Sequence, residues 1–296
     1  MTDPTMINVD PFESALGAEI RGVDLSAPLD EDTAREIEEI WNQHIVIVFR
    51  EQDINIEQQR SFARHFGEIG TRARPGPKPP EAAEYGNDVM LVTNVRKDSK
   101  PIGSLPDGEM MYHSDTPYFE HPAKATMLFG LEVTSVGGHT LFSNCYKAAE
   151  TLSEELKHRL DGKLAMQVYE YGTTLKTQNY DRTKFPHYAH PVFRKHPATG
   201  RSALFVNELM TEEIIGLPRD ESDEILAFLF AHLRRPEFIY EHVWRVGDLV
   251  MWDNRCSLHA RTDFPDDQRR MLRRLTVHDV NPVLAGTPPF REAAAE

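Results

Sequence analysis

The segment Met271-Leu-Arg-Arg-Leu-Thr-Val277 is a short run of strand-forming residues near the end of the chain. Successive side chains of a β-strand point to opposite faces, so Arg274 shares a face with Leu272 and Thr276 while Arg273 lies on the other face. Whichever face is turned inward, one arginine of the pair points into the interior of the fold.

Short runs of the same kind recur along the chain, separated by residues that favour turns. They predict strands at residues 45–49, 89–95, 125–133, 140–143, 164–169, 203–206, 238–244 and 249–252. Three amphipathic helices are predicted at residues 30–44, 56–66 and 220–233, with Asp30 and Asn55 as the first two N-caps. Many short strands with few helices are typical of a β-barrel or a β-sandwich.

The chain has 296 residues and a formal net charge of −14. Because a phosphate-binding surface needs clustered Lys and Arg, so acidic a chain does not fit a nucleic-acid or anionic-membrane partner, and a small-molecule partner is expected. The two cysteines are far apart, and no stretch has the ~20 apolar residues of a membrane span. These features predict a cytoplasmic protein, and we expect residues 1–296 to form a single domain.

Candidate metal ligands stand in Met111-Tyr-His-Ser-Asp-Thr116 and, far downstream, at His259. On a strand, His113 and Asp115 would face the same side. Two imidazoles and one carboxylate with open coordination positions form the ligand set of oxygen-activating non-haem Fe(II) enzymes. Spacing alone is also compatible with ordinary surface or core roles. The same reasoning leaves three other histidines open as candidates: His139, His190 and His278.

The inward arginine predicted from the last strand adds an argument about an anion. A buried guanidinium is destabilising unless it is paired, and a carboxylate that accepts two parallel hydrogen bonds is its best partner. A dicarboxylate co-substrate would supply that partner, and so would one of the 47 acidic residues in a structural salt bridge. The sequence pattern leaves both alternatives open.

Several motifs occur in a fixed order along the chain. They are His113-Ser-Asp115, Gly137-Gly-His-Thr-Leu-Phe142, His190-Pro191, Gly200-Arg201, Gly247-Asp-Leu-Val-Met-Trp-Asp-Asn254, His259 and Arg274. With them the chain resembles, over nearly its whole length, the taurine dioxygenase/2,4-dichlorophenoxyacetate dioxygenase (TauD/TfdA) family of Fe(II)- and 2-oxoglutarate-dependent oxygenases. The resemblance implies a mainly β fold with flanking helices, a double-stranded β-helix (jelly roll, cupin-like), and a homo-oligomer, either a dimer or a tetramer.

By this resemblance, the Fe(II) ligands are His113, Asp115 and His259. Thr140 and Arg274 are implied to hold the distal carboxylate of the co-substrate 2-oxoglutarate, with Arg270 on the same face in reserve. The implied reaction is hydroxylation of a substrate carbon by O2, coupled to conversion of 2-oxoglutarate into succinate and CO2. Because Asp115 fills the carboxylate position, hydroxylation is favoured over halogenation. Hydroxylation next to O, N or S would fragment the product.

The expected substrate is a small anionic organic molecule, such as a carboxylate, an aryloxyalkanoate or a sulfonate. Arg72 falls in a region that contacts the anionic group in family members, with a solvated loop arginine as the alternative. Tyr112 and Met210 depart from the pattern of taurine-specific members, so taurine itself is not expected. Further candidates for the substrate pocket, with ordinary packing beside it as the alternative, are Asn94, Tyr112 and Thr116. Lids are predicted at residues 71–87 and 173–200.

Two other functions are compatible with these residues. A zinc-dependent hydrolase would use the same two histidines and one carboxylate with a water nucleophile, but Thr140 and Arg274 would then lack a shared role. A non-enzymatic jelly-roll binding module would not require intact metal ligands. The fold by itself does not decide between these functions, because function lies in the site.

Overall fold

The computed structural model describes residues 7–71, 82–103, 110–169 and 181–279. Its largest element is an eight-stranded sheet in the order β1-β2-β3-β17-β9-β19-β4, with β5 also paired to β19. The strands are β1 Asn8–Pro11, β2 Ala18–Arg21, β3 Val46–Phe49, β4 Glu68–Ile69, β5 Met90–Thr93, β9 Ala125–Glu132, β17 Leu249–Asp253 and β19 Met271–His278. The central strands β3, β17, β9 and β19 pair antiparallel, so their side chains alternate between the inner and outer faces.

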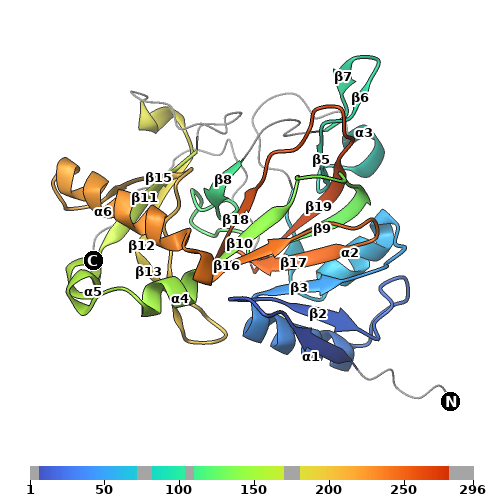
Figure 1. Ribbon diagram of the computed structural model, residues 1–296, viewed down its shortest axis with the longest axis horizontal. Helices are drawn as coiled ribbons and strands as arrows, with labels where there is room; N and C mark the ends of the chain where they lie inside the picture. Colours follow the sequence, from blue (N-terminus) through green and yellow to red (C-terminus); the bar gives the residue numbers. More distant parts are fainter. Residues whose placement is uncertain (1–6, 72–81, 104–109, 170–180, 280–296) are drawn as a thin grey trace.

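A second sheet of four antiparallel strands, in the order β16-β10-β18-β8, occupies the centre of the molecule (Figure 1). These strands are β16 Ile239–His242, β10 Thr140–Asn144, β18 Ser257–Arg261 and β8 Met110–His113. Trp252 of the large sheet makes ring contacts with Phe142 and His259 of the small one, at centroid distances of 5.3 and 4.7 Å. Two sheets that pack face to face over a shared core form a jelly roll. The predicted double-stranded β-helix with flanking helices is confirmed.

Helices α1 (Glu31–His44) and α2 (Ile56–Arg64) cover the outer face of the large sheet, at the right of Figure 1. Both begin after the predicted caps, since the side chains of Asp30 and Asn55 accept hydrogen bonds from backbone N–H groups of the first turn. Their apolar stripes pack on the sheet through Ile37, Trp41, Phe62 and Phe66. The large sheet is therefore apolar on both faces, with the helices outside and the small sheet inside.

A further three-stranded sheet and a hairpin lie on the left of Figure 1 together with three helices. The elements are β11 Leu164–Val168, β12 His187–Pro191, β13 Phe193–Lys195, β14 Ser202–Leu204, β15 Thr211–Ile214, α4 Cys145–Glu150, α5 Glu154–Leu160 and α6 Arg219–Leu233. Residues 173–200, predicted to form a lid, contain regular structure in their described part, because β12 pairs with β11 and β13 pairs with β14. The sequence hides β12 because two of its buried positions are histidines.

Short elements complete the described chain: α3 Ala82–Tyr85, β6 Arg96–Lys97, β7 Lys100–Pro101, η1 Arg182–Lys184 and η2 Pro236–Phe238. The predicted loop at 71–87 thus contains one helical turn, α3, while residues 72–81 lie outside the described part of the chain. Residues 173–180 of the second predicted lid also lie outside it, so both lids stay predictions. Among the described residues, none of the helices is long and apolar enough to cross a membrane.

Candidate active site

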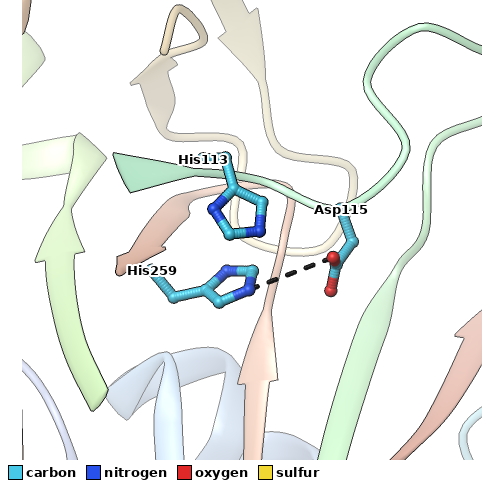
Figure 2. Close-up of side chains that lie close together, drawn as sticks. All are labelled: His113, Asp115 and His259. Atoms are coloured by element: carbon cyan, nitrogen blue, oxygen red, sulfur yellow. Dashed lines mark ion pairs between the residues drawn. The ribbon is translucent and has the colours of Figure 1, made fainter. Parts of the chain in front are cut away.

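Three side chains point toward one another between the two sheets of the jelly roll (Figure 2). His113 at the end of β8 pairs with His259 of β18 across the small sheet, and their ring centroids are 4.1 Å apart. Oδ1 of Asp115 lies 3.9 Å from Nε2 of His259. One candidate ligand atom from each residue lies within 4.8 Å of the other two. The separation suits a single metal ion held by two imidazoles and one carboxylate.

The protonation states of these residues suit a cation. Burial lowers the pKa of His113 and lowers that of His259 further, so both imidazoles are neutral. Nδ1 of His113 donates to the Met111 carbonyl at 2.8 Å, which leaves the lone pair on Nε2. Burial alone would raise the pKa of Asp115, but the charge of Arg274, together with the hydrogen bond from Thr126, holds it well below its usual range. The donor set is therefore ready for a divalent metal without losing a proton.

Asp115 lies two residues beyond the end of strand β8, which stops at His113. The chain turns directly after Asp115, where Thr116 adopts a φ of 56°, which β-branched residues rarely do. The Thr116 hydroxyl accepts a hydrogen bond from the Ala123 N–H at 2.9 Å and fixes this turn. His113 and Asp115 face the same point, as predicted.

The inward arginine of β19 is Arg274, on the face that it shares with Thr276. Arg273 points out toward α2, where its Nε donates to Oε1 of Gln59 at 2.7 Å. Arg274 Nη2 lies 2.7 Å from Oδ1 of Asp115, and its buried Nε has no hydrogen-bond partner among the described residues. The sequence left open whether the inward arginine pairs with a dicarboxylate co-substrate or with an acidic residue. In the structure it forms a salt bridge with an acidic residue, Asp115, which is itself a candidate metal ligand.

Arg270 immediately precedes β19 and is only 3% exposed. Its Nε donates to the Gly138 carbonyl at 3.1 Å, which brings its side chain to the start of β10, where Thr140 lies. Burial, reinforced by the charge of Arg261, lowers the pKa of Arg270 to about 9, and no described carboxylate opposes this shift. Because an unpaired buried cation is costly, an anion is expected here. The geometry associates Thr140 with Arg270, whereas Arg274 lies against Asp115.

A cavity connects all of these groups. Its lining includes the three candidate metal ligands together with Thr140, Arg270, Arg274 and Thr116. Much of the remaining wall is apolar or aromatic: Met90, Val92, Met110, Tyr118, Phe119, Leu128, Tyr169 and Met210. The rings of Tyr118 and Tyr169 stack at a centroid distance of 5.0 Å. Concave, mostly apolar cavities with a few convergent polar groups are typical of small-molecule sites.

Asn94 is not among the described residues that line this cavity, and its place in the substrate pocket stays a prediction. Its side chain makes two hydrogen bonds elsewhere. Its Nδ2 donates to the Gln268 carbonyl at 2.8 Å, and its Oδ1 accepts from the Arg270 backbone N–H at 3.0 Å. Asn94 therefore ties β5 to the segment that carries Arg270, which is the structural alternative to a substrate contact.

Tyr112 is also absent from the cavity lining and packs against the hydrophobic core. Its neighbour His113 points to the metal cluster, so alternation along β8 turns the tyrosine away. A substrate contact by Tyr112 therefore stays a prediction, while Thr116 does line the cavity. Arg72 lies outside the described residues.

Sequence reasoning missed Arg261, which lines the cavity as well. It stands two residues after His259 on β18, so strand alternation could have placed it on the same face. Its guanidinium lies 5.6 Å from the ring centroid of Phe264, and that of Arg270 lies 5.9 Å from the same ring. With Arg274, three arginines converge on one cavity of a chain whose formal net charge is −14. This concentration of charge favours an anionic ligand.

The other candidate histidines are not part of the metal cluster found among the described residues. Nδ1 of His139 lies 2.5 Å from Oε1 of Glu241, and Nε2 of His190 lies 2.8 Å from the Phe119 carbonyl. His278 lines the cavity, and burial lowers its pKa to about 4, so it is neutral at pH 7. His259 is therefore the histidine that completes the triad.

Comparison with known proteins identifies the family of this site. The family model described as "Taurine catabolism dioxygenase TauD, TfdA family" matches residues 8–276. The chain belongs to the TauD/TfdA family. It is 32% identical over 282 residues to the alpha-ketoglutarate-dependent 2,4-dichlorophenoxyacetate dioxygenase of Cupriavidus pinatubonensis (strain JMP 134 / LMG 1197), covering 91% of this chain and 97% of that protein.

Two further proteins are similar to this chain, one in sequence and one in structure. The alkylsulfatase of Acinetobacter baylyi (strain ATCC 33305 / BD413 / ADP1) is 29% identical over 275 residues, which cover 88% of this chain and 82% of that protein. The crystal structure of AAD-2 in complex with Mn(II) and N-oxalylglycine superposes with a TM-score of 0.77 at 29% identity, covering 94% of this chain and 98% of that one. The predicted class, a 2-oxoglutarate-dependent non-haem iron dioxygenase that uses Fe(II) and O2, is confirmed.

Proposed function

We propose that this dioxygenase hydroxylates a small anionic substrate with an apolar or aromatic body, such as an aryloxyalkanoate, an alkyl sulfate or a sulfonate. The proposal rests on one observation: the triad, the inward arginines and an apolar wall line the same cavity. The relatives named for 2,4-dichlorophenoxyacetate and for alkyl sulfates support an anionic substrate with an apolar body.

His113, Asp115 and His259 would hold Fe(II), which supplies O2 activation when it is bound. The neutral imidazoles and the ionised carboxylate supply three donors without deprotonation. The remaining coordination positions would be left for 2-oxoglutarate and O2, as in other non-haem iron oxygenases with this ligand set. The same donors would accept zinc, but a hydrolase gives no role to a second, buried arginine next to Thr140.

We assign the distal carboxylate of 2-oxoglutarate to Arg270 and Thr140 rather than to Arg274. Arg270 is a buried cation with no carboxylate partner among the described residues. The Thr140 hydroxyl accepts from Nε1 of Trp244 at 3.0 Å, so its own proton is free to go to a carboxylate. Arg274 lies beside Asp115 and would instead face the anionic group of the substrate or the carboxylate of 2-oxoglutarate nearer the metal.

Several expectations stay predictions. They are the single domain over residues 1–296, a cytoplasmic location, a homo-oligomer of two or four chains, the lids near 71–87 and 173–200, and a substrate contact by Arg72. Changing Arg72 to Ala should raise the KM for the substrate far more than the KM for 2-oxoglutarate.

Anaerobic addition of Fe(II) and 2-oxoglutarate tests the proposed function most directly. The expected result is a weak visible charge-transfer band, lost in His113→Ala and Asp115→Ala but kept in His139→Ala, a histidine outside the triad. A folded wild-type protein that gives no band would contradict the proposal. Succinate release, screened over aryloxyalkanoates, alkyl sulfates, alkylsulfonates and amino-acid derivatives, then identifies the substrate class.

A further inference from the structure

Two polar side chains, one in the large sheet and one at its edge, hold Asp115: the first binds its carboxylate and the second its backbone N–H. Asp115 itself lies beyond the end of β8 at His113. The hydroxyl of Thr126, on β9, lies 2.5 Å from Oδ2 of Asp115. The side chain of Asn254, just after β17, accepts from the Asp115 backbone N–H at 3.2 Å. Asp115 therefore follows a strand of the small sheet in the sequence, while its carboxylate is hydrogen-bonded by Thr126 of the large sheet.

The direction of each hydrogen bond in this group is determined by its donors. Oδ1 of Asn254 accepts from the Asp115 N–H and from Nε1–H of Trp252, at 3.2 and 3.0 Å. Neither donor is able to accept, so the amide orientation of Asn254 is fixed. Its Nδ2 then donates to the Thr126 hydroxyl at 3.0 Å. Since a hydroxyl has one proton, that of Thr126 is left for Asp115 Oδ2.

Water has no access to replace this contact. Thr126 is 0% exposed, Asn254 is 1% exposed and Asp115 is 4% exposed. Oδ1 of Asp115, by contrast, faces His259 and Arg274, at 3.9 and 2.7 Å. The two oxygens of the carboxylate thus have different environments, one bound by a hydroxyl and the other turned toward the histidines and the cavity.

We propose that Thr126, oriented by Asn254, is a positioning residue for the metal-binding carboxylate. Its hydroxyl occupies Oδ2 of Asp115 and presents Oδ1 alone to the metal, which keeps the other coordination positions open. The inference rests on the proposed metal site and adds the reason why Asp115 provides one oxygen rather than two. Hydrogen-bond partners of metal ligands typically contribute about 10- to 100-fold to metal affinity.

The test is Mn(II) binding to the whole protein, with free Mn(II) measured by electron paramagnetic resonance. Thr126→Val keeps the shape of the side chain and removes the hydroxyl, and we expect its Kd to rise about 10- to 100-fold. Thr126→Ser should restore binding to within about threefold, because the donor is restored. Thr126→Cys, a weaker donor, should lie between them and replaces the valine variant if that variant does not fold.

Ser143→Ala is the matched control, because Ser143 is a fully buried strand hydroxyl that donates to the Leu233 carbonyl at 2.7 Å, outside the site. Its thermal stability should fall while its Kd for Mn(II) stays at the wild-type value. Wild-type Mn(II) affinity in both Thr126→Val and Thr126→Cys would overturn this inference and leave the proposed function intact. A wild-type protein that does not bind Mn(II) would overturn both.

Discussion

At the scale of single residues, three arginines of one short segment have different partners. Among the described residues, Arg270 donates to the Gly138 backbone carbonyl and lies over the Phe264 ring, Arg273 donates to Gln59 of α2, and Arg274 faces Asp115. Strand alternation predicted from the sequence that one of Arg273 and Arg274 points inward, and this is confirmed. The identity of each partner depends on tertiary contacts across more than 100 residues, which the local pattern does not contain.

Changing Arg270 to Met should weaken 2-oxoglutarate binding about 100-fold, since removing one partner of a buried charge pair costs about 3 kcal/mol. Arg273→Met, three residues further along the same segment, is the matched control. Because Arg273 points to α2, this variant should lose stability but keep its Kd for 2-oxoglutarate within about threefold. The Kd is measured by anaerobic titration calorimetry in the presence of Mn(II). Equal weakening in both variants would remove Arg270 from its proposed role.

At the scale of elements, the sequence predicted structure that depends on neighbouring residues, but not structure that depends on contacts between distant residues. The caps of α1 and α2 lie within three residues of the groups that they bind, so the sequence shows them directly. Asp115 instead has a partner far away in the sequence, since Asn254, which accepts from its backbone N–H, is 139 residues away. For this reason, the H-x-D pattern predicted the residues of the site but not the contacts that hold them.

The capping box of α2 gives an element-scale prediction. The Asn55 side chain accepts from the Gln58 N–H at 3.0 Å, and Oε1 of Gln58 accepts from the Asn55 N–H at 2.8 Å. Asn55→Ala should lower the free energy of unfolding by about 1 kcal/mol. Asn55→Asp, which keeps an accepting oxygen, should remain close to wild type in urea unfolding. If alanine and aspartate behave alike, the cap does not stabilise this helix.

At the scale of the whole molecule, a buried ion network joins the β13–β14 hairpin to the jelly roll. His196, in the hairpin, lies 2.9 Å from Oδ2 of Asp253 at the end of β17, and Arg255 donates to both oxygens of the same carboxylate at 2.9 and 2.7 Å. His196, Asp253 and Cys256 also have metal-ligand spacing. Because Arg255 already occupies the carboxylate, we read the group as a structural link. Composition and periodicity do not reveal it, since its members come from separate motifs.

This network predicts a specific dependence of stability on pH. Burial would raise the pKa of Asp253, but Arg255 and His196 outweigh it and lower the pKa to about 2. A carboxylate whose pKa is lower in the folded state contributes stability above its unfolded pKa of about 4 and loses that contribution as the pH falls toward 2. The contribution at pH 7 is on the order of 2 kcal/mol.

Asp253→Asn should therefore be less stable than wild type by about 3 kcal/mol at pH 7, because the buried Arg255 loses the carboxylate that accepts two of its hydrogen bonds. The difference in the free energy of unfolding should shrink as the pH falls from about 4 toward 2, because the Asp253 carboxyl of the unfolded wild-type chain takes up a proton there while the folded one keeps its charge. Urea unfolding at several pH values measures this difference, with the exposed Asp266→Asn as the control. A difference that stays constant across this range would mean that packing of the hairpin, and not the charge of Asp253, stabilises the contact between the hairpin and the jelly roll.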